Sequence, residues 1–175
     1  MPDKDIATEV IAHTRSYAGA IAALTEELVV IDSENPPGNH YPECVALLKH
    51  RLDALGWCSR VLDVPGEQTG SPRTIILAGP DDDRPVLAFH GHYDVVPADD
   101  RQQFVPLRQG NCLAGRGTAD MKGGVAAMIY AATAVRDCLP EMGVRIALVI
   151  VPDEETGGLL GSGYLQQQGL IDRNT

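Results

Sequence analysis

A stretch late in the chain, residues 144–151, restricts the fold more than any other, because its apolar residues occupy both faces of an extended strand. A strand with one solvent-exposed face alternates apolar and polar residues, whereas a strand covered on both faces is apolar at nearly every position. The stretch is therefore typical of a sheet with helices packed on both sides. Three further strand-like segments precede it, at residues 59–64, 74–78 and 86–89, and clusters of Gly, Pro and Asp separate them.

Helical periodicity surrounds these strands. Apolar residues recur in steps of three, four or seven over residues 6–31, which predicts one long amphipathic helix ended by the turn at residues 35–38. The same reasoning predicts a second helix over residues 45–55 and a third over residues 125–135, ending before Pro140. Because helices and strands alternate, the predicted class is α/β, a three-layer α/β/α arrangement with a mostly parallel sheet and helices on both faces.

Length and charge limit the classes of protein and of partner. The 175 residues suit one domain, and 14 Lys and Arg against 24 Asp and Glu give a formal charge of −10. Nucleic acid and anionic membranes bind basic faces, so neither is an expected partner. The longest apolar run, residues 146–151, is far shorter than the roughly 18 residues of a membrane span, and the acidic first residues lead into no signal-peptide core. The four cysteines form no Cys-x-x-Cys pair, so we expect free thiols and a cytoplasmic location.

Polar blocks follow the predicted strands at the places where chemistry is expected. In α/β sheets, functional side chains collect at the carboxyl ends of the strands. Residues 90–97 follow the third strand, residues 152–158 follow the last one, and the glycine-rich residues 115–124 open the third helix. The candidate functional side chains in these blocks are His92, Asp94, Asp120, Glu154 and Glu155. Imidazole and carboxylate groups are the ligands that zinc and similar divalent ions accept.

Each block also has a purely structural interpretation. His92 and Asp94 point to the same side of an extended chain, so Asp94 is placed to accept the second ring N–H of a metal-bound His92. The same pair equally suits a hydrogen-bonded core histidine. Asp120 stands at a helix entrance, where a carboxylate is favoured as a cap. Glu154 and Glu155 suit a solvated loop as well as a site in which one carboxylate binds a metal and the other contacts its water. The residues alone leave these alternatives open.

As a set, the three blocks resemble a known family. They read Gly-His-Tyr-Asp-Val-Val-Pro at residues 91–97, Gly-Arg-Gly-Thr-Ala-Asp-Met-Lys-Gly-Gly at residues 115–124 and Asp-Glu-Glu-Thr-Gly-Gly at residues 153–158. In order and spacing they are similar to the metallopeptidase family of acetylornithine deacetylase, succinyl-diaminopimelate desuccinylase, aminoacylase and bacterial glutamate carboxypeptidase. The Asn-Pro-Pro-Gly turn at residues 35–38 also resembles a turn common near the start of family members. The resemblance covers almost the whole chain.

The resemblance implies a role for each candidate residue. Family members bind two divalent ions, usually zinc with cobalt or manganese as alternatives, bridged by one carboxylate. His92 matches a ligand of one ion, Asp120 matches the bridge, and Glu155 matches a ligand of the other ion. Glu154 matches the general base, and Asp94 matches the acid that orients the histidine. The implied reaction is hydrolysis of an amide bond, in an N-acyl amino acid or a small peptide, by a metal-activated water.

The chain also departs from the family pattern. The loop at residues 98–114 is shorter than in most relatives and lacks their tryptophan, so the resemblance assigns no substrate contact near Phe104. Relatives are much longer: they carry a further Asp or Glu ligand, a second metal-binding His, and an inserted lid and dimerisation domain that makes them homodimers. We therefore expect residues 1–175 to be the N-terminal part of a catalytic domain, with the inserted domain absent and the fold incomplete at its C-terminal end.

Two interpretations of function follow from these observations. The first is a dinuclear amidohydrolase, and the second is a truncated, non-catalytic α/β fragment that retains at most a partial metal site. Nucleotide binding is disfavoured, because the spacing of Gly115, Gly117 and Asp120 breaks the dinucleotide pattern at its third glycine and no Gly-Lys-Ser/Thr is present.

Overall fold

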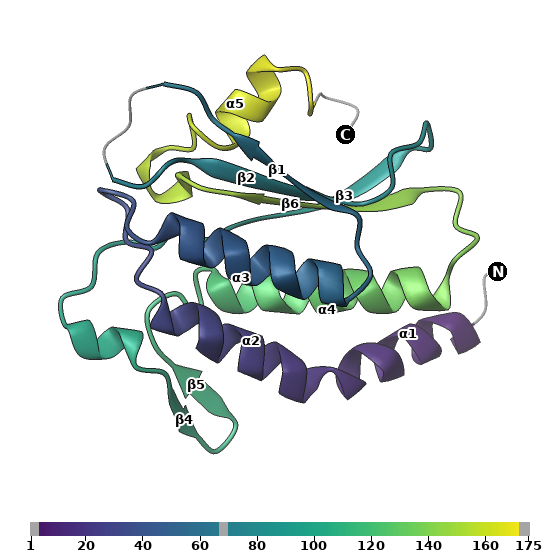
Figure 1. Ribbon diagram of the computed structural model, residues 1–175. Helices are drawn as coiled ribbons and strands as arrows, with labels where there is room; N and C mark the ends of the chain where they lie inside the picture. Colours follow the sequence, from purple (N-terminus) through teal and green to yellow (C-terminus); the bar gives the residue numbers. More distant parts are fainter. Residues whose placement is uncertain (1–3, 67–69, 172–175) are drawn as a thin grey trace.

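A computed structural model describes residues 4–66 and 70–171, and a four-stranded sheet lies at its centre (Figure 1). The strands are β1 (Ser59–Asp63), β2 (Thr74–Ala78), β3 (Val86–His92) and β6 (Arg145–Val151), in the spatial order β1-β2-β6-β3. The prediction of an α/β fold with helices on both faces is confirmed, and β2 has the predicted bounds.

The prediction of a mostly parallel sheet is wrong. β1 pairs with β2 and β2 pairs with β6 in antiparallel directions, and β3 with β6 is the one parallel pair in this sheet. The reason lies in the connections, because parallel neighbours need a crossover of a dozen or more residues. The chain between β3 and β6 is long enough and contains a helix. The short connections after β1 and after β2 each reverse the chain, so β2 runs opposite to β1 and β3 and therefore also opposite to β6.

Helices cover the two faces of the sheet unequally. α3 (Tyr41–Ala54) and α4 (Lys122–Cys138) lie on one face, and the short α5 (Ser162–Gln167) lies on the other (Figure 1). α1 (Lys4–Ser16) and α2 (Ala18–Val30) pack against α4, on the side of it that faces away from the sheet. These two helices therefore add an outer layer to the predicted three.

The prediction of one unbroken helix over residues 6–31 is also wrong. The helix is interrupted at Tyr17, whose ring packs 5.0 Å from the ring of Tyr130 in α4. A straight helix over both segments would be about 40 Å long against about 25 Å for α4, at 1.5 Å per residue. Because the break changes the direction of the chain, both α1 and α2 contact α4.

Strand β6 contributes to two apolar clusters, one on each face of the sheet. Leu148 and Ile150 face the helices α2, α3 and α4. Val149 and Val151 face α5, where they pack against Leu165. All four β6 residues are buried. The apolar stretch at residues 144–151 thus forms the doubly covered strand that its composition predicts.

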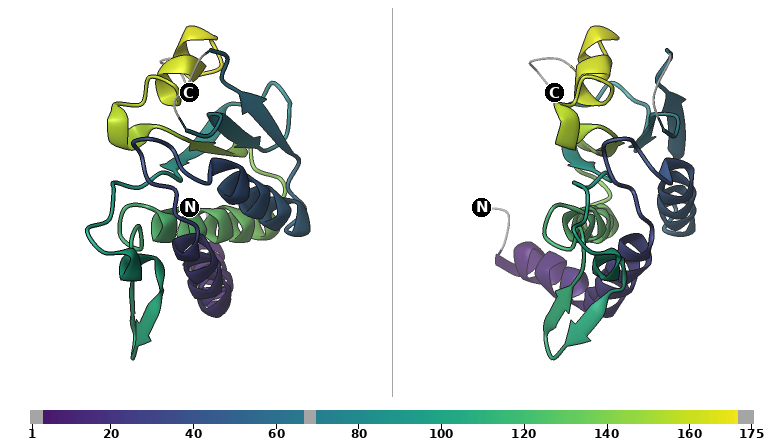
Figure 2. Two further views of the ribbon diagram at one scale, coloured as in Figure 1. Left: turned by 60° about the vertical axis from the view of Figure 1, so that its left-hand side comes forward. Right: turned by 90° about the vertical axis from the view of Figure 1, so that its left-hand side faces the viewer.

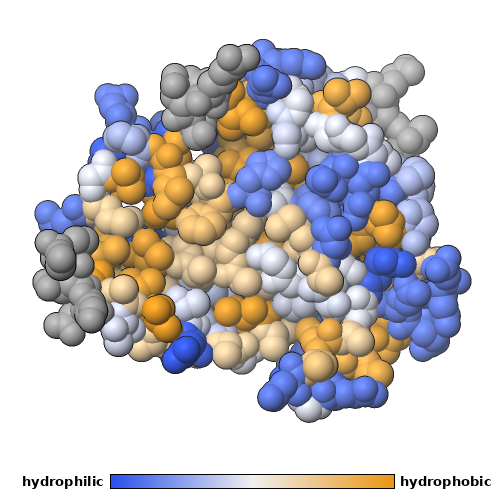
Figure 3. Space-filling model, turned by 180° about the vertical axis from the view of Figure 1, so that it is seen from behind, coloured by the Kyte–Doolittle hydropathy of each residue, from blue (hydrophilic) through white to orange (hydrophobic). Residues whose placement is uncertain are grey.

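Strand β3 forms the outer edge of the sheet beside β6. The side views show β1 and β3 at opposite edges (Figure 2), and no described strand lies beyond β3. The rear face of the molecule carries a broad apolar area (Figure 3), and Leu87 of β3 is 52% exposed. β3 is therefore one of the two open edges of the described sheet, with β1 at the other.

The loop at residues 98–114 contains regular structure. A 3-10 turn, η1 (Arg101–Phe104), precedes a small hairpin of β4 (Leu107–Gln109) and β5 (Cys112–Ala114). All four cysteines are free thiols, as expected. Among the helices of the described residues, none combines the length and apolar character needed to span a membrane.

Candidate metal centre

The parallel pairing of β3 with β6 brings the sequence-predicted residues together. His92 is the last residue of β3 and lies in register with Val151, the last residue of β6. The turn η2 (Glu154–Thr156) follows β6 almost directly, and Asp120 lies just before α4. One ligand atom each from His92, Asp120 and Glu155 lies within 4.8 Å of the others. Three segments far apart in sequence therefore meet at the end of the sheet where β3 and β6 finish.

The His92 ring is buried and faces carboxylates on both sides. Its Nε2 lies 3.1 Å from Oδ1 of Asp120 and 3.8 Å from Oε2 of Glu154. Its Nδ1 lies 3.0 Å from the carbonyl oxygen and 3.2 Å from Oδ1 of Asp94. Burial lowers the pKa of His92, but hydrogen bonds and charge from Asp94, with a further contribution from Asp120, outweigh burial and raise the pKa to about 9. A cation at Nε2, whether a proton or a metal ion, is strongly favoured here.

The Asp94 carboxylate is fully buried and connects β3 with the η2 turn. Besides the His92 ring, it accepts hydrogen bonds from the backbone N–H of Glu154 (3.2 Å), the backbone N–H of Glu155 (3.1 Å) and the side-chain amide of Asn35 (2.9 Å). Burial raises the pKa of Asp94, and the hydrogen bonds more than offset this, so the pKa lies below its ordinary value. Asp94 is thus a stable anion that holds the His92 ring and the Glu154–Glu155 backbone in one arrangement.

The two neighbouring glutamates occupy different environments. Glu155 is partly buried, and burial, aided by the charges of Asp120, Asp94 and Glu154, raises the pKa of its carboxyl. The Glu154 side chain is more exposed, with Oε2 near His92. The preceding Asp153 is buried at a φ of 75°, and its carboxylate accepts hydrogen bonds from Thr156 Oγ1 and the Leu160 N–H. Asp153 therefore braces the turn that presents the glutamates.

Asp120 is the most exposed of the candidate ligands, with a side chain that is 77% accessible. The segment around it is held by Lys122, whose fully buried ammonium donates to the carbonyls of Leu28 (2.8 Å) and Ile31 (2.6 Å). A Cβ at Gly123 would clash with the carbonyl oxygen of Thr118, which explains why a glycine is needed here. These contacts fix the start of α4 against the end of α2, and they thereby fix the position of Asp120.

Sequence reasoning missed three residues that organise this centre. Lys122 and Thr156 lie inside the polar blocks but carry no metal-ligand signature, and Asn35 was noted only as part of a turn. The available signal was the unusual Asn-Pro-Pro-Gly turn. It was not enough, because the turn lies far from the polar blocks in sequence and nothing placed it beside Asp94.

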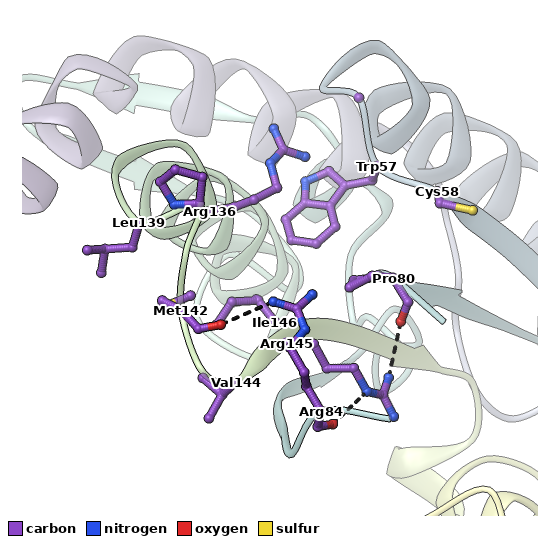
Figure 4. A pocket seen from close by; sticks show the side chains of 13 residues that line it. Trp57, Cys58, Pro80, Arg84, Arg136, Leu139, Met142, Val144, Arg145 and Ile146 are labelled. Carbon is purple, nitrogen blue, oxygen red and sulfur yellow. Dashed lines mark hydrogen bonds between the residues drawn. The ribbon is translucent and has the colours of Figure 1, made fainter. Parts of the chain in front are cut away.

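A cavity of about 250 Å³ lies at the opposite end of the sheet, where β3 and β6 begin (Figure 4). Trp57 and several apolar side chains line it, along with Arg84, Arg136 and Arg145. Each of these arginines donates hydrogen bonds to backbone carbonyls. The guanidinium groups that line the cavity are therefore already hydrogen-bonded to the protein backbone. The cavity is separate from the centre at His92.

Known proteins match this chain in sequence and in fold. The family model for peptidase family M20/M25/M40 matches residues 88–174. The succinyl-diaminopimelate desuccinylase of Delftia acidovorans is 35% identical over 138 residues, which cover 75% of this chain and 35% of that protein. The chain thus spans about a third of the length of such curated relatives.

Solved structures share the fold. Human carnosine dipeptidase 1 is 26% identical with a TM-score of 0.71, covering 92% of this chain and 38% of its own. The di-peptidase Dug1p from Saccharomyces cerevisiae has a TM-score of 0.74 at 18% identity, covering 92% of this chain and 37% of its own. All five candidate residues, from His92 to Glu155, lie inside the range that the family model matches, and the chain belongs to peptidase family M20/M25/M40.

Proposed function

We propose that this protein serves metal-dependent hydrolysis of amide bonds, in N-acyl amino acids or small peptides. The observation that supports this most directly is the convergence of His92, Asp120 and Glu155 within 4.8 Å, with the Glu154 carboxylate beside them. One imidazole and several carboxylates form a donor set that suits zinc and also cobalt or manganese. The described residues therefore fit a divalent metal.

Each of the three ligand residues would have its own role in holding the metal. His92 and Glu155 would each bind one ion, and Asp120 would bridge the two, as the family resemblance implies. When bound, the ions supply Lewis-acid chemistry, lowering the pKa of a water molecule and polarising the substrate carbonyl. The number of ions and their identity as zinc are part of the proposal.

The remaining residues would move the proton and hold the ligands. Glu154, which presents an exposed carboxylate beside His92, would accept a proton from the attacking water and deliver it to the leaving amine. Asp94 would keep Nε2 of His92 directed at the centre by binding Nδ1. The formal charge of −10 disfavours nucleic acid and anionic membranes as partners. A small peptide or an N-acyl amino acid as the substrate is what the family resemblance implies.

A second candidate function is a partial metal site without turnover. Within the described residues, His92, Asp120 and Glu155 form the one such ligand cluster, so a bridged pair would receive two protein ligands per ion with one shared. Catalytic zinc usually has three protein ligands and a water. We propose accordingly that residues 1–175 form the N-terminal part of a cytoplasmic catalytic domain.

Metal binding and turnover, measured separately, test these two functions. The purified chain is titrated with Zn²⁺ or Co²⁺ and then assayed on N-succinyl and N-acetyl amino acids and on dipeptides. Saturable binding that is lost in His92→Ala supports the metal centre. Turnover by a monomer would support the complete hydrolase, binding without turnover would support the partial site, and failure to bind either ion would overturn both.

A further inference from the structure

The segment that follows α2 runs beside the segment that follows β3. The backbone N–H of Asn35 donates to the carbonyl of Val95 at 2.8 Å, and the N–H of Val95 donates to the carbonyl of Ser33 at 3.0 Å. The Ser33 hydroxyl donates to the carbonyl of Tyr93 at 2.7 Å. These bonds fix the register of the two segments and place Asn35, which is 1% exposed, next to Asp94.

The side-chain amide of Asn35 is bound at both ends. Its Nδ2 donates to Oδ2 of Asp94 at 2.9 Å and to Oγ1 of Thr156 at 2.9 Å. Its Oδ1 accepts a hydrogen bond of 3.4 Å from the buried guanidinium of Arg73. A guanidinium only donates and a carboxylate only accepts, so these partners fix which way the amide points.

We propose that Asn35 is a positioning residue of the metal centre. Through the Asp94 carboxylate it fixes the His92 ring and the backbone of Glu154 and Glu155, and through Thr156 it fixes the rest of the η2 turn. This inference rests on the proposed function, and it assigns a role to the Asn-Pro-Pro-Gly turn that the ligands themselves do not explain.

The hydrogen-bond donors around Asp94 divide between its two carboxylate oxygens. Oδ1 of Asp94 contacts the His92 ring and the N–H of Glu154, while Oδ2 accepts from the N–H of Glu155 and from Asn35. Without the amide of Asn35, Oδ2 keeps one of its two donors, and the carboxylate is held less firmly against the turn. Groups that hydrogen-bond directly to a metal-binding side chain affect metal affinity by about 10–100-fold, and Asn35 acts one bond further out, through Asp94.

An asparagine is the side chain that the position requires. Asp153 also lies beside the amide, with Oδ1 3.5 Å from Nδ2. An aspartate at position 35 would have the same shape but would offer an acceptor to Asp94 and Asp153 where both need a donor. It would also bury a third carboxylate among them, which is unfavourable in a site of low solvent access.

The test compares Asn35→Asp and Asn35→Ala with the matched control Asn39→Asp. Asn39 is the residue that directly follows this turn, and among the described residues its side chain takes part in no hydrogen bond. Two quantities are measured: amide hydrogen exchange by NMR at Glu154 and Glu155 in the metal-free chain, with Val149 in β6 as internal reference, and Co²⁺ affinity by absorption titration. Both Asn35 variants are expected to exchange at least about 10-fold faster at the two glutamates and to bind Co²⁺ about 10-fold more weakly, the lower end of the range for direct partners of the ligands. Asn39→Asp is expected to match the wild type in both.

The outcomes separate this inference from the proposed function. A folded Asn35 variant with wild-type exchange at Glu154 and Glu155 and wild-type Co²⁺ affinity overturns the positioning role, even if its melting temperature falls, and leaves the metal centre standing. If Asn35→Asp does not fold, Asn35→Ala decides by the same two measurements. If the wild type itself fails to bind Co²⁺, the proposed function is wrong, and the exchange rates alone then decide whether Asn35 holds the η2 turn.

Discussion

Nε2 of His92 lies 3.1 Å from Oδ1 of Asp120, although the two residues are 28 positions apart and belong to different elements. A histidine and a carboxylate at this distance form a hydrogen bond or an ion pair, or they are two ligands of one cation. The pKa of His92, raised to about 9, shows how strongly the surroundings favour positive charge at this ring. The arrangement leads to specific expectations for metal binding, catalysis, folding and association.

Replacing His92 by alanine is expected to abolish high-affinity metal binding, because it removes the one imidazole among the three converging ligands. The loss in affinity should exceed the roughly 10–100-fold seen when only an outer partner is removed. Calorimetric titration with Zn²⁺ measures it. His40→Ala, a change at an exposed histidine outside the centre, is the control and should retain wild-type affinity. Equal affinity in both variants would contradict the assignment of His92.

Glu154→Gln is expected to separate metal binding from catalysis. The amide keeps the size of the side chain but cannot accept a proton, so turnover in any metal-loaded form with hydrolase activity should fall by about 100-fold or more. Metal content should stay nearly unchanged, because Glu154 lies outside the converging ligand set. Rates on an N-acyl amino acid and metal content by mass spectrometry are compared with those of Glu141→Gln, at an exposed position. If the Glu154→Gln variant kept most of its rate, the base would have to be Glu155 or Asp153.

Lys122→Met is expected to destabilise the fold rather than the chemistry alone. The methionine fills the same space but cannot donate to the carbonyls of Leu28 and Ile31, each of which keeps one backbone N–H donor. Losing a hydrogen bond from a charged donor costs about 1.5–3 kcal/mol, and removing a buried charge offsets part of this cost. The free energy of unfolding should therefore fall by about 1–3 kcal/mol. Urea denaturation measures it.

Lys49→Met is the control for that experiment. Lys49 forms a partly exposed pair with Asp53, and such pairs contribute about 0–1 kcal/mol. A similar loss of stability in both variants would show that the buried hydrogen bonds of Lys122 have no special importance.

Leu87→Lys is expected to reduce self-association of the chain. Leu87 lies 52% exposed on β3, at a sheet edge with no described strand beyond it, and a lysine on an edge strand opposes pairing between chains. Light scattering after size exclusion should show the mass of the wild type rising with concentration and that of the variant staying near one chain. Val30→Lys adds the same charge at an exposed position on α2 and should behave like the wild type. A monomeric wild type at all concentrations would contradict this expectation.

Local patterns in the sequence predicted most of the elements. The bounds of β2 and the doubly apolar character of β6 follow from side-chain periodicity, which depends on residues close in the chain. The direction of the strand pairs did not follow, because it depends on the length of the connections and on which strands become neighbours. The break at Tyr17 likewise depends on packing against α4, which a helical repeat does not report.

For the candidate site, the residue types already define which chemistry is possible. The side chains that carry it stand in polar blocks after strands and before a helix: His92, Asp94, Asp120, Glu154 and Glu155. Which of these groups meet depends on the folded chain, which also brings in Asn35, 59 positions from Asp94, and the buried ammonium of Lys122. The reason is physical: residue type sets what a side chain can bind, whereas contacts between distant segments are fixed by the parallel register of β3 with β6 and by the packing of α2 against α4. Those contacts form only when the whole core is assembled.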